Sequence, residues 1–194
     1  MTPVSCFVVD VGHLRRSPGL QWHRTWREPM ADLVVTGSAV PAGQPVELDV
    51  VLESVLGGVR ALGVVRFGWA GACRRCLRPA AGSVEVAVAE MFTPGSDGED
   101  TYPLVGDLVD LEPLVRDAVL LELPPAPLCH PGCRGLCPAC GTDRNVATCR
   151  CGPALDGRWA ALDQLYPAPA RRAPRAVSGE DLRSSYRAAG PTTR

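Results

Sequence analysis

The chain has 194 residues and a formal net charge of −1 at pH 7, and all 20 of its Lys and Arg residues are arginine. Its hydrophobic fraction of 46% excludes a wholly disordered chain, and no uncharged apolar run reaches the roughly 18 residues that a membrane helix needs. The N-terminus lacks the basic start and apolar stretch of a secretory signal. We therefore expect a cytoplasmic protein without a membrane partner, where clustered cysteines are more often metal ligands than disulfides.

The small net charge hides two parts of opposite sign. Residues 1–128 contain ten arginines and sixteen acidic residues, which gives −6, whereas residues 129–194 contain ten arginines and five acidic residues, which gives +5. Binding to nucleic acid through a high overall positive charge is therefore excluded. A localised arginine surface is still compatible with the sequence, because arginine can bind a phosphate through two parallel hydrogen bonds.

The first part of the chain, 1–92, is predicted to form strands. Short apolar or alternating runs, separated by Gly and Pro, occur at 6–11, 32–37, 45–55, 58–71 and 82–92. The third of these runs is typical of a half-buried strand, because polar residues alternate with Val46, Leu48, Val50 and Leu52. Several strands at this spacing favour a small twisted antiparallel sheet or a partial barrel.

The hydrophobic period changes after a polar loop at 93–107. A helix is predicted over about 110–122, with Asp110 as N-cap, Glu112 in the first turn and the sequence PPAP after its end. The apolar residues that fall mostly on one face of this helix are Leu111, Leu114, Val115, Ala118, Val119 and Leu121. The sequence therefore favours an α+β fold with this helix at its centre.

The C-terminal part is predicted to contain a cysteine-rich lobe, a short helix and a tail. The lobe covers 129–166, and the sequence DGRWAALDQL predicts a closing helix that begins with Asp156 as its cap. Residues 167–194 are rich in Pro, Ala, Arg and Ser and contain six arginines against two acidic residues, which predicts a disordered basic tail. One domain is thus expected over 1–166.

Eight of the nine cysteines are clustered in two regions of the sequence, and they are Cys73, Cys76, Cys129, Cys133, Cys137, Cys140, Cys149 and Cys151. Two cysteines separated by two residues form a knuckle that directs both sulfurs at one ion, and this spacing occurs at 73/76 and at 137/140. Zinc binds four such thiolates in a tetrahedron. Gly141 after the second knuckle accommodates the tight backbone, whereas Leu77 follows the first.

The preferred grouping places two zinc ions on the eight cysteines. Cys137, Cys140, Cys149 and Cys151 form a compact site, and the upstream knuckle reaches across the sequence to a second pair to give Cys73, Cys76, Cys129 and Cys133. The alternative is one zinc on the two knuckles, with the other cysteines free. His130 is expected to be an ordinary loop residue, and Cys6 a buried apolar residue.

Neither grouping predicts an enzyme. A catalytic zinc usually has three protein ligands and an open position, whereas sets of four cysteines are closed. The sequence contains no H-E-x-x-H motif, no G-x-S-x-G motif and no phosphate-binding Gly-Lys loop. We therefore expect structural metal ions, no catalytic residues and no small-molecule substrate.

The order of these motifs resembles the YceD family, also known as domain of unknown function 177. The resemblance covers about 45–165 and rests on GACRRCLRP, LELPPAPLC, CRGLCPACGTDRN, CRC and DGRWAALDQL, with HLRRSPG as a weaker match near the N-terminus. Thr142, Asp143 and Arg144 stand where the family often has a less charged segment. The matching residues are Cys73, Arg75, Cys76, Leu77, Gly135, Leu136, Cys137, Cys140, Gly141, Asn145, Cys149, Cys151, Asp156, Arg158, Trp159 and Leu162.

The resemblance implies a non-enzymatic protein that is needed for the accumulation of the 23S-type ribosomal RNA (rRNA) of the large subunit. Its gene in this family commonly lies beside that of a small zinc-binding ribosomal protein, a possible partner. From the residues themselves, phosphate contact is assigned to the arginines that flank the cysteines, which are Arg74, Arg75, Arg78, Arg134, Arg144 and Arg150. Two other interpretations remain open: an adaptor that binds a large-subunit ribosomal protein, and a switch that releases zinc when its thiolates are oxidised.

Overall fold

The computed structural model describes residues 6–96, 98, 100–152 and 158. The chain divides into two compact units, Met1–Arg150 and Cys151–Arg194. The predicted closing helix, apart from Arg158, and the predicted tail at 167–194 lie outside the described residues. Across the described part of the chain, no helix combines the length and the hydrophobicity that a membrane crossing needs.

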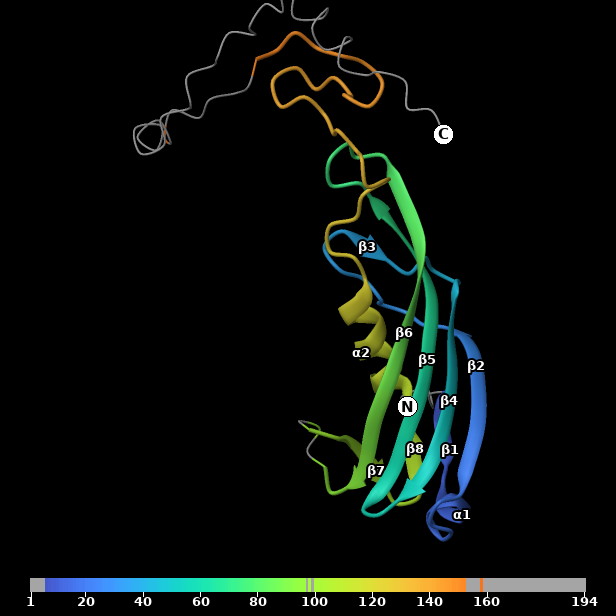
Figure 1. The fold of residues 1–194 in the computed structure, drawn as a ribbon. Coiled ribbons are helices and arrows are strands. Elements are labelled where there is room, and N and C mark those ends of the chain that lie inside the picture. Colours follow the sequence, from blue (N-terminus) through green and yellow to red (C-terminus); the bar gives the residue numbers. More distant parts are fainter. Residues whose placement is uncertain (1–5, 97, 99, 153–157, 159–194) are drawn as a thin grey trace, which may run out of the picture. The chain divides into compact units, whose positions relative to one another are not determined.

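A mixed, mainly antiparallel sheet of eight strands dominates the first unit (Figure 1). Its order across the sheet is β1-β8-β7-β6-β5-β4-β2, and β3 pairs with β5 beside this path. The only parallel pairing among the described strands joins β6 to β7, with Phe92 opposite Tyr102. The strands are β1 (Val8–Asp10), β2 (Gln21–Pro29), β3 (Ser38–Ala39), β4 (Pro45–Val55), β5 (Gly58–Ala72), β6 (Pro79–Pro94), β7 (Tyr102–Val105) and β8 (Leu108–Asp110).

The sheet curls into an open half-barrel around the helix α2 (Glu112–Glu122), which packs on β5 and β6 (Figure 1). Close backbone approach accompanies this curl at Gly63, where an added Cβ would lie 2.2 Å from the carbonyl oxygen of Asp49. The concave face holds the main core. β4 supplies the four alternating residues Val46, Leu48, Val50 and Leu52, and α2 supplies Leu114, Val115 and Val119.

The helix prediction is confirmed, with two differences in detail. The N-cap residue is Leu111 and makes no side-chain capping bond, while Asp110 accepts a 2.9 Å hydrogen bond from the backbone N–H of Glu112. Leu121 is 84% exposed, so it does not belong to the buried face. The helix ends at Glu122, and the extended backbone of its C-cap residue Leu123 leads into the Pro-rich segment.

Three expectations about the N-terminal part and the loop are wrong, and some elements were not predicted. The run at 32–37 is a loop with one isolated bridge from Val34 to Ala39, and the predicted polar loop at 93–107 contains the end of β6, all of β7 and the turn to β8. β2 and the short helix α1 (Gly12–Arg15) were not predicted. Cys6 is exposed, and its carbonyl oxygen accepts a 3.1 Å hydrogen bond from the indole N–H of Trp26.

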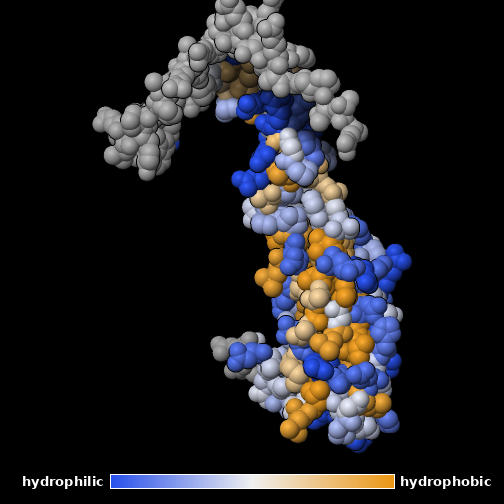
Figure 2. All heavy atoms as spheres, viewed as in Figure 1, coloured by the Kyte–Doolittle hydropathy of each residue, from blue (hydrophilic) through white to orange (hydrophobic). Residues whose placement is uncertain are grey.

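The outward face of the sheet combines apolar and paired charged residues. Figure 2 shows hydrophobic residues over the middle of the sheet, with hydrophilic residues among and beside them. Arg60 binds Glu53 on the neighbouring strand, and Arg66 binds Glu85 at 2.6 Å. Exposed ion pairs of this kind contribute at most about 1 kcal/mol each. Their arginines are therefore already paired, unlike Arg74, Arg134, Arg144 and Arg150 near the cysteines, which form no ion pair with the described residues.

Candidate metal centre

The β5–β6 hairpin carries the first cysteine knuckle at its tip. The two strands pair from Val59 opposite Phe92 to Ala72 opposite Pro79, and residues 73–78 form the turn. Because these strands have 15 and 16 residues, the turn stands at the far end of a long ladder. The backbone N–H of Arg74 also donates a 2.9 Å hydrogen bond to the carbonyl oxygen of Pro127, which joins the turn to the segment after α2.

The two knuckles have the same backbone hydrogen bonds. In the first, Cys73 N–H donates to Arg78 O at 2.8 Å and Leu77 N–H donates to Cys73 O at 2.9 Å. In the second, Cys137 N–H donates to Thr142 O at 2.8 Å and Gly141 N–H donates to Cys137 O at 2.9 Å. Leu77 accordingly has a φ of 61°, close to the 72° of Gly141. The first knuckle therefore holds a leucine in a left-handed conformation that favours glycine.

Replacing Leu77 with glycine is expected to stabilise the protein by ~1 kcal/mol, because a side chain in the left-handed region costs about that much. Leu77 is 67% exposed, so little apolar burial is lost. Urea denaturation of the metal-loaded protein measures the effect. The matched control is Leu56→Gly, in an exposed turn where φ is not positive, which should lower stability by roughly 0.5–1 kcal/mol. A lower free energy of unfolding in Leu77→Gly would contradict the prediction that the backbone at Leu77 is strained.

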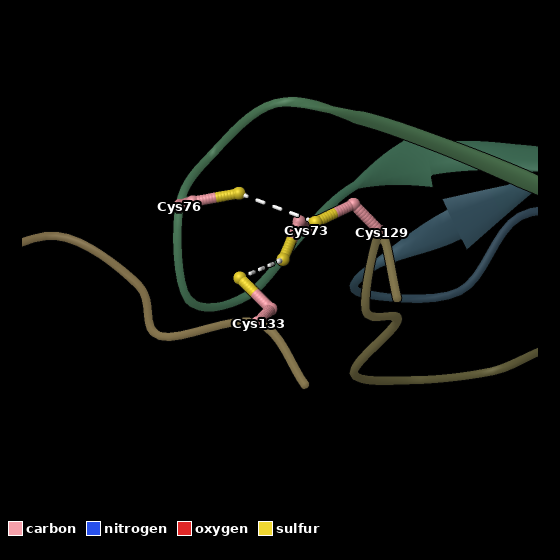
Figure 3. Close-up of side chains that lie close together, drawn as sticks. All are labelled: Cys73, Cys76, Cys129 and Cys133. Atoms are coloured by element: carbon pink, nitrogen blue, oxygen red, sulfur yellow. Dashed lines mark hydrogen bonds between the residues drawn. The ribbon is translucent and has the colours of Figure 1, made fainter. Parts of the chain in front are cut away.

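The first group of four cysteines lies between the hairpin tip and the segment after α2. The sulfurs of Cys73, Cys76, Cys129 and Cys133 lie within 4.8 Å of one another and point toward a common centre (Figure 3). Two pairs are separated by 3.7 Å, from Cys73 to Cys133, and by 3.5 Å, from Cys76 to Cys129. These distances exceed a disulfide bond and match the edge of about 3.8 Å of a sulfur tetrahedron with a metal–sulfur distance of about 2.3 Å.

The protein environment favours a thiolate at one of these four sulfurs. Burial alone would raise the pKa of Cys73, but backbone N–H groups of Cys129, Cys76 and Arg75 donate to its sulfur and lower the pKa to about 6. Burial and the neighbouring sulfurs raise the pKa of Cys129 to about 12. At Cys76, the backbone N–H of Arg78 lowers the pKa, yet burial and the sulfurs of Cys73 and Cys133 leave it above its ordinary value.

Metal binding to this group is expected to release protons from Cys76 and Cys129 but not from Cys73. The pKa values of the first two thiols are raised, so they hold protons at pH 7, and a metal ligand must be a thiolate. The affinity should therefore increase as the pH rises from about 6 to 9. Calorimetric titration with Zn²⁺ in buffers of different ionisation enthalpy measures the released protons. A heat that is independent of the buffer would contradict this prediction.

Arg75 and Gly135 join the hairpin tip to the cysteine segment. One guanidinium N–H of Arg75 donates to the carbonyl oxygen of Cys133 at 2.8 Å, and the carbonyl oxygen of Arg75 accepts from Leu136 N–H at 2.9 Å. Gly135 has a φ of 71°, and a Cβ there would lie 2.9 Å from the carbonyl oxygen of Arg75. Only glycine fits this approach without strain, so the two segments are fixed side by side.

Asn145 connects the second knuckle segment to the first group. Its side-chain N–H donates to the sulfur of Cys133 at 3.5 Å, and its side-chain oxygen accepts from Arg134 N–H at 2.7 Å. Asp143 accepts from both Nδ2 and the backbone N–H of Asn145 at 2.8 Å and also forms an ion pair with Arg78. The pKa of Asp143 is below its usual range, mainly because the backbone N–H of Asn145 donates to its carboxylate. The side-chain amide of Asn145 and the charge of Arg78 lower the pKa further, whereas burial raises it. The sequence indicates Asn145 only as a residue that matches the family motif, and it does not predict the contact with the sulfur of Cys133.

The second group contains Cys137, Cys140, Cys149 and Cys151, whose sulfurs also lie within 4.8 Å of one another. Backbone N–H groups of Cys140 and Ala139 lower the pKa of Cys137. Cys140 and Cys151 are exposed, whereas in the first group Cys73, Cys76 and Cys133 are buried. Both groups are those that the sequence predicts, and His130 is an exposed loop residue, as expected.

The six arginines predicted to contact RNA are all exposed, but they divide into two kinds. Arg75 and Arg78 hold the cysteine segments together through the bonds described above. The side chains of Arg74, Arg134, Arg144 and Arg150 make no ion pair with the described residues. Arg144 N–H donates to Gly135 O at 2.9 Å, which brings its backbone beside that of Arg134.

The fold and the cysteines define a class of protein. It has a curled sheet whose longest hairpin carries a cysteine knuckle, and later cysteines complete two candidate sites for a tetrahedrally bound metal ion. The family model described as "Large ribosomal RNA subunit accumulation protein YceD" matches residues 63–166, and the chain belongs to this family. An uncharacterized protein of Mycobacterium tuberculosis is 37% identical over 170 residues, which cover 83% of this chain and 82% of that protein.

Two further relatives extend the comparison. An uncharacterized protein of Mycobacterium leprae is 34% identical over 173 residues, which cover 84% of this chain and 80% of that protein. A chloroplast protein of Zea mays, named a large ribosomal RNA subunit accumulation protein YCED homolog, is 34% identical over 53 residues, or 27% of this chain and 18% of that protein. No solved structure matches the chain. The family suggested by the sequence motifs is thus confirmed.

Proposed function

We propose that this protein is a non-enzymatic ribosome biogenesis factor that supports the accumulation of 23S-type rRNA during assembly of the large subunit in the cytoplasm. The observation that carries the proposal is the buried four-cysteine group at the tip of the β5–β6 hairpin, in a chain of the YceD family. The family description names large-subunit rRNA accumulation. The cysteine group supplies the rigid frame on which an RNA contact can be built.

Zinc is the ion that we assign to both groups. Four thiolate ligands with knuckle spacing are typical of structural zinc sites, and a set of four protein ligands leaves no position for a substrate. Backbone N–H groups that donate to Cys73 and Cys137, together with Asn145 at Cys133, are the outer contacts that thiolate ligands commonly have. Reducing conditions in the cytoplasm would keep these thiols available.

The RNA contact is assigned to the arginines around the cysteines that have no acidic partner among the described residues. These arginines are exposed, and each guanidinium group can bind a phosphate through two parallel hydrogen bonds. They are Arg74, Arg134, Arg144 and Arg150. Arg75 and Arg78 act mainly by holding the frame, because their guanidinium groups bind Cys133 O and Asp143. The contact is therefore expected to read the RNA backbone rather than base edges.

Depletion of the protein in its own cells is expected to reduce 23S-type rRNA relative to 16S-type rRNA. The triple variant Arg74→Gln, Arg134→Gln, Arg144→Gln should fail to restore it and should lower the salt dependence of RNA binding by a slope of about 2. The matched control replaces Arg60, Arg66 and Arg116 with Gln. It removes the same charge, but from arginines that are paired with acidic residues. An unchanged rRNA ratio on depletion would reject the proposal.

Two outcomes would favour the other interpretations. If the protein co-sediments with a large-subunit ribosomal protein after nuclease treatment, it acts as a protein adaptor, and direct RNA contact is rejected. If a low dose of peroxide releases metal from the protein in cells and rRNA falls in proportion, the exposed thiols of the second group act as a redox switch. RNA-dependent co-sedimentation with metal retained supports the assembly factor.

A further inference from the structure

A second group of basic and aromatic residues lies in the segment that forms α1 and β2. Between Val11 and Arg27 the chain has four arginines, two histidines and two tryptophans, but no acidic residue. The segment lies near the start of β5, because Gly19 N–H donates to Ser54 O at 2.9 Å and Ser54 pairs with Val59. The cysteine knuckle follows the other end of the same strand.

This segment is fixed to the sheet. Val11 and Leu14 are fully buried, and α1 packs against β4. Arg15 donates to Asp107 at 2.7 Å and to Gly106 O at 2.8 Å, which anchors α1 on the β7–β8 turn. Arg15 is thus occupied, whereas the next residue, Arg16, is exposed on a rigid support.

Trp22 is the centre of the exposed part of this group. The guanidinium carbon of Arg24 lies 5.0 Å from the centre of the Trp22 ring, a cation–π contact. The His13 ring is nearly parallel to that of Trp22, with an angle of 11° and 6.2 Å between the centroids. Trp22 is half-buried and packs against the main core, so its position is set by the sheet. Three flat side chains are therefore stacked at the margin of the sheet.

Two positive charges of this segment, on Arg16 and Arg24, have no acidic partner among the described residues. Arg27 pairs with Glu47 and His23 with Asp49, but Arg16 and Arg24 form no ion pair within the described part of the chain. Arg24 uses one N–H, which donates to His23 O at 3.0 Å, and its other N–H groups are available. Arg16 is three residues after His13, which places both on one side of the α1 turn.

We propose that Arg16, His13, Trp22 and Arg24, which we call the α1–β2 surface, bind a single-stranded segment of RNA. Stacked aromatic and guanidinium groups favour an unpaired base, and the two free arginines favour its phosphates. An acidic protein segment would be bound by the charges alone and would gain little from stacking on Trp22. The proposal rests on the proposed function, since it assigns to the same RNA a second contact.

The strand register gives the distance along β5 between the α1–β2 surface and the arginines near the cysteines. Trp22 pairs with Leu52, which pairs with Ala61, and the strand continues to Ala72 beside the knuckle. These eleven residues, at about 3.3 Å each, correspond to roughly 36 Å along β5. One RNA can therefore contact the cysteine end and the α1–β2 surface with two different segments. Their simultaneous use would increase the affinity beyond that of either contact.

The test uses the full-length, zinc-loaded protein and a single-stranded RNA of about 20 nucleotides that contains 4-thiouridine. Arg16→Gln with Arg24→Gln is expected to weaken binding about tenfold at moderate salt and to lower the salt slope by about 1.4. Both residues are exposed, so folding should be retained. The matched control, Arg60→Gln with Arg66→Gln, removes the same charge from paired positions. Photo-crosslinks are expected within residues 12–27, at Trp22 or His13.

Four outcomes decide the proposal. Weaker binding of the double variant, together with crosslinks in 12–27, supports it. Unchanged affinity and no crosslink in this segment would overturn it, while a loss of binding in the Arg74, Arg134, Arg144 variant would leave the proposed function intact. Displacement of RNA by polyglutamate at equal charge would overturn it in favour of an acidic protein partner. No RNA binding by the unmodified protein would also overturn it, and depletion in cells would then decide the proposed function separately.

Discussion

Replacing Cys73 with serine is expected to reduce bound zinc from two ions per chain to about one and to unfold the hairpin tip. Cys73 is fully buried, and its sulfur lies 3.7 Å from that of Cys133, 60 residues later in the sequence. A structural zinc in a finger peptide is worth about 10–16 kcal/mol, so loss of one ligand removes much of what holds these segments together. Elemental analysis and limited proteolysis after α2 measure the two effects.

The sheet should remain folded in this variant. The buried cysteines form a small cluster with Leu128 and Leu136, separate from the main core of the half-barrel. The strand signal in circular dichroism should therefore be retained while protease sites appear after 124. Cys6→Ser is the matched control, since Cys6 is exposed and belongs to neither cysteine group. Retention of both ions by Cys73→Ser would reject the assignment of the first site.

Replacing Asn145 with alanine is expected to weaken zinc binding at the first site by about 10- to 100-fold, although Asn145 is not a ligand. Its amide donates to the sulfur of Cys133 and accepts from Arg134 N–H. Loss of such an outer contact commonly costs this much affinity, and the unpaired N–H group of Arg134 adds a further cost. Competition with a chromophoric chelator measures the affinity.

Val146→Ala is the control for this variant, because the neighbouring Val146 is 73% exposed. Asn145→Asp separates the two contacts of the amide. It keeps an oxygen for Arg134 N–H, loses the N–H that faces Cys133 and adds a negative charge near a thiolate. Its zinc affinity should therefore be as low as that of Asn145→Ala or lower. An affinity equal to that of the unmodified protein in both variants would show that Asn145 does not support the site.

The sequence predicts those parts of the fold whose pattern comes from burial on one face. β4 alternates cleanly because Val46, Leu48, Val50 and Leu52 all face the core, and α2 has three buried residues at helical spacing. The two knuckles were also predictable, because knuckle spacing is set by the geometry of the ion rather than by the rest of the chain. The grouping that the structure shows was the preferred one of the two that the sequence left open.

Other parts could not be predicted because neighbours in space decide them. In β2, Trp22, Arg24 and Trp26 lie on one face of the strand. Because a charged arginine stands between the two tryptophans, the sequence does not show the alternation of apolar and polar residues that predicts a strand. β7 and β8 are too short to show a period and depend on pairing with β6 and β1. The left-handed backbone of Leu77 follows from the hydrogen bonds of the knuckle, which override the preference of the side chain.

The separation between the main core and the cysteine cluster has a consequence for the life of the protein in the cell. The half-barrel can fold as soon as it leaves the ribosome, whereas the proposed zinc sites form only when the ion binds. Zinc starvation should therefore yield long-lived chains that are complete in the sheet yet inactive at the tip. Under the proposed function, large-subunit production would in this way decline with the zinc supply.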